Sequence, residues 1–270
     1  MAKRKVQKPQ GVKKPANKKY GVFIWLGGLL FIGLFGWYVV HVWHLQQEEA
    51  KAEAAIYNAF GIEMPSKYYI HGIDVSSFQN SIAWKKVASM KVKNVSMGFV
   101  FIKATEGLGN VDENFRKNYN SAKKAGMICG AYHFFLATKS GTIQAANFIR
   151  NVPIATGDLP PVVDIEQLYG VQPLMMRKRL KECLDAIETA YKTKPILYSN
   201  VDFYEKYLGS EFDAYPLWAA HYDEQDKPRI GRDWLFWQHS ESGHVNGIAT
   251  RVDCDVFNGD STAFRKLLLQ

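Results

Sequence analysis

Two carboxylates stand two residues apart in the stretch 160–167, which reads PPVVDIEQ. The apolar residues before them are typical of a buried strand. Side chains alternate along a strand, so Asp164 and Glu166 share one face. Two partly buried carboxylates at this spacing do not both ionise easily, because burial and like charge raise the pKa of one of them. One acid can then donate a proton near neutral pH while the other stabilises a positive charge, a division of roles that glycosidic-bond hydrolysis uses.

The pair alone leaves a metal site and a salt bridge with arginine open as alternatives. Further acids lie at or near the ends of other apolar runs: Asp74, Glu106, Asp253 and Asp255. No HxxxH or HxH spacing accompanies them, and Cys129, Cys183 and Cys254 show no CxxC spacing, so no metal site is predicted. The three thiols are expected to be buried and inert. No GxGxxG or P-loop motif follows an apolar run, so no nucleotide cofactor is expected.

Aromatic side chains accompany the acids in the same runs. They are Tyr132, Phe134, Tyr198, Trp218, Tyr222 and Trp237. Sugar rings stack on aromatic faces through their C–H surfaces, so a polar site lined by Tyr and Trp suits a carbohydrate. For each aromatic residue taken singly, packing in the core is the alternative role. His133, His221 and His239 adjoin these aromatics and carry no metal-ligand spacing.

Eight short β-rich runs must position these side chains. They cover residues 69–76, 98–105, 128–135, 160–166, 195–200, 215–222, 234–240 and 251–257. Helical patterns follow the first four runs, and a shorter one follows the fifth. These patterns cover residues 82–91, 113–126, 140–152, 173–192 and 201–209. The connections between the last three runs are short and turn-like.

Alternation of strand and helix predicts an α/β fold with a parallel sheet and right-handed crossovers. Eight strands in about 200 residues favour a closed, modified TIM-like barrel, (β/α)5(β)3, over an open doubly wound sheet, which is the alternative. Functional side chains of such barrels lie at the C-terminal ends of the strands, where the acids are found. If the eighth strand neighbours the first, Asp74 and Asp253 meet on one wall and face the pair on the fourth strand.

The net charge of +8 is concentrated at the N-terminus. Residues 1–19 hold eight of the 34 Lys and Arg residues and no acid, which leaves 26 basic against 26 acidic residues in the remainder. The body of the protein is therefore neutral, and no nucleic-acid partner is predicted. Residues 1–19 are expected to form a basic cytoplasmic tail.

Residues 20–43 contain no Asp, Glu, Lys or Arg, and 24 residues are enough to span a bilayer as a helix. Trp and Tyr lie toward both ends, where aromatic belts form. A cleaved signal peptide and a buried soluble helix are the alternatives. The charges before the span predict a single-pass anchor in the inner (cytoplasmic) membrane with the N-terminus in the cytoplasm. Residues 44–67 are then a stalk, and residues 68–270 a periplasmic or extracellular domain.

Eight motifs occur in order along that domain: GIDVSSFQ, FIKATEG, GAYHFF, PPVVDIE, LYSN, LWAAHY, FWQHS and VDCDVFNG. The ordered set over residues 68–270 resembles the glycoside hydrolase family 25 lysozymes, which are muramidases with a modified β/α barrel. The resemblance implies cleavage of the β-1,4 bond between N-acetylmuramic acid and N-acetylglucosamine in peptidoglycan strands. It implies that Glu166 is the catalytic acid/base, that Asp164 is its charged partner, and that Asp74 and Asp253 complete the site. The family often has Asn where this chain has Asp255, so the role of Asp255 is open.

The residues expected to bind the substrate are Tyr132, Tyr198, Trp218, Tyr222 and Gln238. Two routes for the second step stay open: direct attack by Asp164, or attack by the N-acetyl oxygen of the substrate, which we favour because the two acids lie close along one strand. Two other functions stay open as well. One is a peptidoglycan-binding scaffold without catalysis, and the other is a glycosidase for another N-acetylated glycan such as chitin. An enzyme held at its own membrane is expected to remodel its own wall.

Overall fold

The computed structural model describes Gly11 and residues 18–270, and the basic tail expected over residues 1–19 lies almost wholly outside them. The chain divides into two compact units, with the division after Lys51. Helix α1 runs from Lys18 to Phe60. Its large apolar side chains from Phe23 to Leu45 are exposed, except that of Val42, which is half-buried. By length and composition, the part Phe23–Phe60 could cross a membrane.

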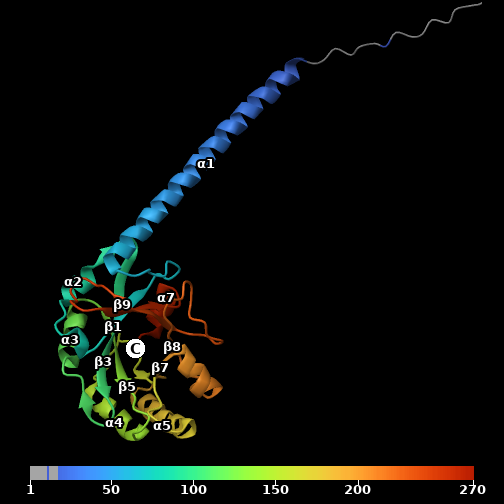
Figure 1. Cartoon of the computed structure of the whole chain (residues 1–270). Coiled ribbons are helices and arrows are strands. Elements are labelled where there is room, and N and C mark those ends of the chain that lie inside the picture. The colour runs from blue at the N-terminus through green and yellow to red at the C-terminus, as the bar shows by residue number, and fades with distance from the viewer. Residues whose placement is uncertain (1–10, 12–17) are drawn as a thin grey trace, which may run out of the picture. The chain divides into compact units, whose positions relative to one another are not determined.

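The second unit is built around a closed barrel of eight strands (Figure 1). The strands are β1 (His71–Val75), β3 (Val95–Glu106), β5 (Ile128–Phe134), β6 (Val162–Asp164), β7 (Ile196–Asn200), β8 (Leu217–Ala220), β9 (Phe236–Gly243) and β10 (Val252–Phe257). They pair in this order, and pairing of β1 with both β3 and β10 closes the ring. Two short strands, β2 (Lys91–Val92) and β4 (Asn110–Val111), pair only with β3. The eight predicted strands and the closed barrel are confirmed.

Strand β10 departs from the expected parallel sheet. It pairs antiparallel with both β9 and β1, whereas the other six pairings around the barrel are parallel. Only residues 244–251 connect β9 to β10, and a parallel return needs a crossover of roughly a dozen residues. The N-terminal end of β10 therefore lies beside the C-terminal ends of the other strands, and it carries Asp253 to the same edge as Asp74.

Helices cover the outside of the barrel after the first strands (Figure 1). They are α2 (Trp84–Ser89), α3 (Phe115–Lys124), α4 (Gly141–Asn151) and α5 (Pro173–Tyr191). The shorter helix expected after the fifth strand is split into α6 (Val201–Phe203) and two irregular turns that reach Phe212. A further helix, α7 (Ser261–Leu267), was not expected. Asp260 caps its N-terminus by accepting from the backbone N–H groups of Thr262 and Ala263.

Alternation along the strands produces two cores, one on each side of the sheet. Outward side chains such as Val163 and Ile165 pack under the helices. Inward side chains fill the lower barrel with aromatic rings, and Phe101 stacks on Trp218 with ring centroids 4.5 Å apart. Phe264 of α7 packs against this inner cluster at the end of the barrel away from the mouth. Because aromatic rings fill the barrel below its mouth, the cavity inside the ring of strands opens at the mouth.

The segment expected to be a stalk, residues 44–67, is helical as far as Phe60. The side chain of Phe60 is fully buried in the outer core, and its carbonyl accepts a 2.8 Å hydrogen bond from the backbone N–H of His244. Ile62 is also buried in this core. The end of this segment therefore packs with the barrel.

Candidate active site

A cavity of about 270 Å³ opens at the barrel mouth, and all nine residues expected at the site line it. Those residues are Asp74, Tyr132, Asp164, Glu166, Tyr198, Trp218, Tyr222, Gln238 and Asp253. Four more side chains complete the lining: Ser76, Lys103, Phe134 and Glu241. The eight strands thus gather residues that are spread over 180 positions of sequence, from Asp74 to Asp253.

Asp164 is the last residue of β6 and Glu166 lies two residues beyond it, and backbone hydrogen bonds to the segments on both sides hold this pair. The carbonyl of Asp164 accepts from Phe135 N–H at 2.8 Å, and Ile165 N–H donates to the carbonyl of Tyr198 at 3.0 Å. This extended backbone turns Asp164 and Glu166 into the mouth, as the period of two predicted. The carboxyl of Asp164 is 5% exposed, and its Oδ1 has no hydrogen-bond partner among the described residues.

Both acids of the pair hold protons more tightly than an ordinary carboxyl. Burial, then the charge of Glu166, raises the pKa of Asp164 well above its usual range. Burial raises the pKa of Glu166, and a hydrogen bond shared with Asp164 opposes that rise. The ammonium of Lys103 lowers the pKa of each acid and is the smaller effect. The pair can therefore retain a proton at pH values where an exposed carboxyl has lost it.

Lys103 is a site residue that sequence reasoning missed. Its Nζ lies 2.7 Å from Glu106 Oε2 and 4.7 Å from the centroid of the Phe134 ring. Glu106, one of the candidate acids, is thus an ion-pair partner and does not line the cavity. The motif FIKATEG contains both charges three residues apart, and that spacing was the available signal.

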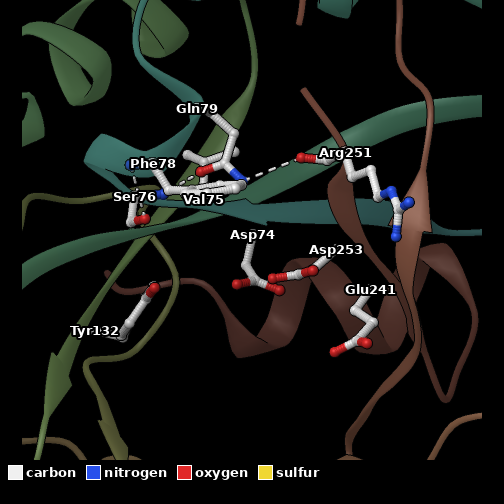
Figure 2. A pocket seen from close by; sticks show the side chains of 9 residues that line it. All are labelled: Asp74, Val75, Ser76, Phe78, Gln79, Tyr132, Glu241, Arg251 and Asp253. Carbon is white, nitrogen blue, oxygen red and sulfur yellow. Dashed lines mark hydrogen bonds between the residues drawn. The ribbon is translucent and has the colours of Figure 1, made fainter. Parts of the chain in front are cut away.

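The opposite wall is formed by β1 and β10. Asp74 and Asp253 are direct partners in the antiparallel register, and Figure 2 shows their carboxyl groups facing one another. Gln238 connects this wall to two tyrosines: its Nε2 donates to Asp74 Oδ2 at 2.6 Å. Its Oε1 accepts from the hydroxyls of Tyr198 at 2.8 Å and Tyr222 at 2.6 Å. Gln238 therefore fixes three neighbouring side chains.

Asp255 lies two residues deeper along β10 than Asp253 and is fully buried. Its Oδ1 accepts a 2.9 Å hydrogen bond from Trp218 Nε1, and its Oδ2 has no partner in the described part of the chain. Burial, then the charge of Asp253, raises the pKa of Asp255 well above its usual range. Trp218 is itself only 2% exposed, so it forms the floor of the cavity beside Asp255.

The other two acids of this wall are also shifted. Burial, then the charges of Asp253 and Asp255, raises the pKa of Asp74 well above its usual range. Burial, then the charge of Glu241, raises the pKa of Asp253 to about 6. Three carboxyl groups this close share protons, because full ionisation would place three like charges in a region of low solvation.

Some residues that sequence reasoning grouped with the site lie elsewhere. Trp237 points outward, is fully buried, and packs against Tyr68 and Trp234. His133 is buried beside Thr105, with 2.7 Å between its Nδ1 and the hydroxyl oxygen. Cys129, Cys183 and Cys254 are buried free thiols, as expected. Across Gly11 and residues 18–270, no three His, Cys, Asp or Glu side chains are arranged to hold a metal ion.

Comparison with known proteins identifies the family. Residues 73–248 match the family model of glycosyl hydrolases family 25. An uncharacterized protein of Escherichia coli strain K12, YegX, is 41% identical over 201 residues, 74% of this chain and 74% of that protein. Lysozyme M1 of Streptomyces globisporus is 34% identical over 207 residues, 71% of this chain and 69% of that protein.

The fold leads to the same family. The solved structure of a family 25 glycosyl hydrolase from Bacillus anthracis matches with a TM-score of 0.70 at 33% identity, covering 77% of this chain and 97% of that chain. The matched stretch 73–248 begins inside β1 and contains the barrel strands from β3 to β9. The chain is a glycoside hydrolase and belongs to glycosyl hydrolase family 25.

Proposed function

We propose that this glycoside hydrolase is an N-acetylmuramidase, which cleaves the β-1,4 bond between N-acetylmuramic acid and N-acetylglucosamine in peptidoglycan. The observation that carries the proposal is the pair on β6, two carboxyl groups with raised pKa values in a polar cavity at the barrel mouth. The lysozyme relatives support peptidoglycan as the substrate.

Glu166 is the proposed general acid and base. It donates its proton to the glycosidic oxygen as the bond from that oxygen to C1 breaks, and a cation develops at C1. Burial raises the pKa of this carboxyl group, so it holds its proton to a higher pH than an exposed carboxyl does. In the second half of the reaction, Glu166 takes a proton from the water that attacks C1.

Asp164 is the proposed stabiliser of the intermediate. Its unpartnered Oδ1 can accept a hydrogen bond from the N–H of the substrate's N-acetyl group. That bond would orient the N-acetyl oxygen toward C1, where it closes a cationic ring that water then opens. Direct attack by Asp164 is the alternative, and trapping a covalent sugar ester on Asp164 with a slow substrate would exclude the assisted route.

Asp74, Asp253 and the tyrosine pair are proposed to bind the sugar. The hydroxyls of Tyr198 and Tyr222 already donate to Gln238, so each keeps an oxygen lone pair for a sugar hydroxyl. Tyr132 lines the cavity between the two acidic walls and offers both a ring face and a hydroxyl. No metal or cofactor enters this proposal.

The test is digestion of purified peptidoglycan by the full-length protein in detergent, beside the Glu166→Gln variant. Products are reduced and analysed for the sugar at the new reducing end. Muramic acid there, absent with the variant, supports the proposal. N-acetylglucosamine ends would mean that another bond is cut, and bound but intact glycan would favour a scaffold.

We further propose that α1 anchors the enzyme in the cytoplasmic membrane by a single span over residues 20–43, with residues 1–19 in the cytoplasm. The barrel then faces the periplasm or cell exterior, where peptidoglycan lies. The exposed apolar side chains from Phe23 to Leu45 support an anchor over a buried soluble helix. Extraction of full-length protein from membranes by carbonate would contradict the anchor, and loss of residues 1–43 from the mature protein would indicate a cleaved signal.

A further inference from the structure

A second cavity of about 520 Å³, whose lining is drawn in Figure 2, shares part of its lining with the catalytic cavity. Five lining residues are common to both cavities: Asp74, Ser76, Tyr132, Glu241 and Asp253. The four residues that line only the second cavity are Val75, Phe78, Gln79 and Arg251. None of these four has a role in the proposed cleavage. A glycan strand seated on the acids therefore has a continuous path into this space.

Phe78 presents an exposed ring from a fixed turn. The ring is 68% exposed, although the backbone beneath it is held by three hydrogen bonds. Ser76 Oγ accepts from Phe78 N–H at 3.2 Å, and Gln79 Oε1 accepts from Ser76 N–H at 2.8 Å. Asp112 Oδ2 accepts from Ser77 N–H at 2.8 Å. A single exposed ring is common on proteins, but one held in place at the edge of a cavity is a preformed apolar contact for a ligand.

Arg251 supplies the positive charge of the second cavity. Its carbonyl accepts a 3.3 Å hydrogen bond from Gln79 Nε2, drawn in Figure 2, so its backbone is tied to the same turn. Its guanidinium forms no ion pair or hydrogen bond with any described residue, although Glu241 and Asp253 line the same cavity. An arginine that leaves nearby carboxylates unpaired keeps its planar donors free for a carboxylate on a ligand.

We propose that Phe78 and Arg251 form a subsite for a carboxylate on the muramic acid side branch of the substrate, which makes this inference rest on the proposed function. Muramic acid carries a lactyl group that ends in a carboxyl, and in peptidoglycan that group bears a peptide with carboxylates of its own. Arg251 binds the carboxylate and the Phe78 ring packs against the adjoining sugar or peptide. Glu241 in the same cavity suits an ammonium group of such a peptide.

The test is a binding measurement with full-length protein in detergent that carries Glu166→Gln, so that no probe is cleaved. Three soluble probes are titrated: glycan with its peptides, the same glycan after amidase removal of the peptides, and an N-acetylglucosamine oligomer, which has no carboxylate. Arg251→Gln is compared with Arg116→Gln, a matched change on the exposed face of α3 that lines neither cavity.

We expect Arg251→Gln to weaken binding of a carboxylate-bearing probe about tenfold, because a charge-assisted pair is lost, and to leave the neutral oligomer unchanged. In the first probe the lactyl carboxyl is bound in the amide bond to the peptide, and amidase treatment frees it as a carboxylate. Loss on the first probe alone therefore places the carboxylate on the peptide, loss on the amidase-treated probe alone places it on the lactyl group, and loss on both means that Arg251 binds either carboxylate. Equal loss on all three probes, no loss on any, or no binding of any probe overturns the subsite. Turnover by protein with Glu166 intact is measured in parallel, so failure of cleavage is seen separately from failure of the subsite.

Discussion

The two acidic walls of the barrel mouth differ in how their carboxyl groups are satisfied. On β6, Asp164 and Glu166 face the cavity with Lys103 nearby, and Asp164 Oδ1 has no partner among the described residues. On β1 and β10, Asp74 is held by the Gln238 amide and Asp255 by the Trp218 indole. Burial raises the carboxyl pKa values on both walls, so charge alone does not distinguish them.

The difference lies in where the free hydrogen-bonding capacity is placed. Asp164 lines the cavity, whereas Asp255, whose Oδ2 also lacks a partner among the described residues, does not line it. A buried oxygen without a partner is unfavourable in the empty enzyme and becomes satisfied when a substrate donor arrives. The wall of β6 therefore has the capacity to act on substrate, whereas the wall of β1 and β10 uses its capacity to hold side chains in place. Changes on β6 should mainly lower the rate, and changes on the other wall should mainly alter stability and positioning.

The largest effect is expected from Glu166→Gln. The variant has no proton to donate, and general acid catalysis contributes about 10²–10⁴-fold, so kcat should fall by that factor. The side chain is partly exposed, so the melting temperature should change little. Steady-state turnover of peptidoglycan and thermal unfolding measure the two. A rate within about threefold of that of the original protein would show that Glu166 takes no part in the chemical step.

Asp164→Asn should lower kcat by about 10²–10³-fold, because a neutral amide stabilises the cationic intermediate less well than a carboxylate. Folding should be unaffected or improved, since the change removes a buried carboxyl that has an unpartnered oxygen. Asp202→Asn, an exposed acid on α6, is the control for loss of a charge. A clear drop in melting temperature with Asp164→Asn would show that this wall also supports the fold.

Gln238→Leu tests the other wall. The change leaves the hydroxyls of Tyr198 and Tyr222 without their acceptor and Asp74 without its donor. Unpaired buried polar groups cost about 1–3 kcal/mol, so the free energy of unfolding should fall by that amount, and kcat by about tenfold as the acids lose their positions. Denaturant titration measures the free energy of unfolding.

Tyr222→Phe is the graded partner of that change, because it removes one of the three hydrogen bonds and leaves the other two. Its loss of stability should be clearly smaller than that of Gln238→Leu. Equal losses in the two variants would mean that Gln238 does not connect the wall.

The β6 wall could be predicted from the sequence because it depends on local order. The strand period alone places Asp164 and Glu166 on one face. The meeting of Asp74 with Asp253 followed from barrel closure, but the direction of β10 did not, since the short connection 244–251 had to be recognised as a hairpin. Gln238 as a connector could not be foreseen, because its contact with Asp74 joins residues 164 positions apart and depends on register.

Two further features were beyond the sequence for related reasons. The stretch expected as a stalk, residues 44–67, contains Phe60, which is buried in the outer core, and nothing in its Ala- and Glu-rich composition indicates that contact. The second is α7, whose short pattern after the last strand is too brief for periodicity to indicate a helix. Phe264 of α7 packs against Phe257, which is near in sequence, and against Phe99 and Phe236, which are distant.

The smallest effect on rate is expected from Asp255→Asn. This change should instead alter how the stability of the protein depends on pH. Burial and the charge of Asp253 raise the pKa of Asp255 in the folded protein, so the folded state holds a proton that the unfolded chain releases near its ordinary pKa. The stability contributed by this proton is fully present below the unfolded pKa and is lost as pH rises through the folded pKa. An asparagine does not titrate, and its amide oxygen can still accept from Trp218 Nε1.

As the pH rises from about 4 to 8, the Asp255→Asn variant should therefore lose less stability than the original protein. At pH 8 its melting temperature should be higher than that of the original protein by a few degrees. Turnover should stay within about threefold, because the carboxyl lies below the cavity and is fully buried. Thermal unfolding across this pH range measures the slope. Parallel slopes in the two proteins would show that Asp255 carries no proton of its own, and a large loss of turnover would place it with the acids of β6.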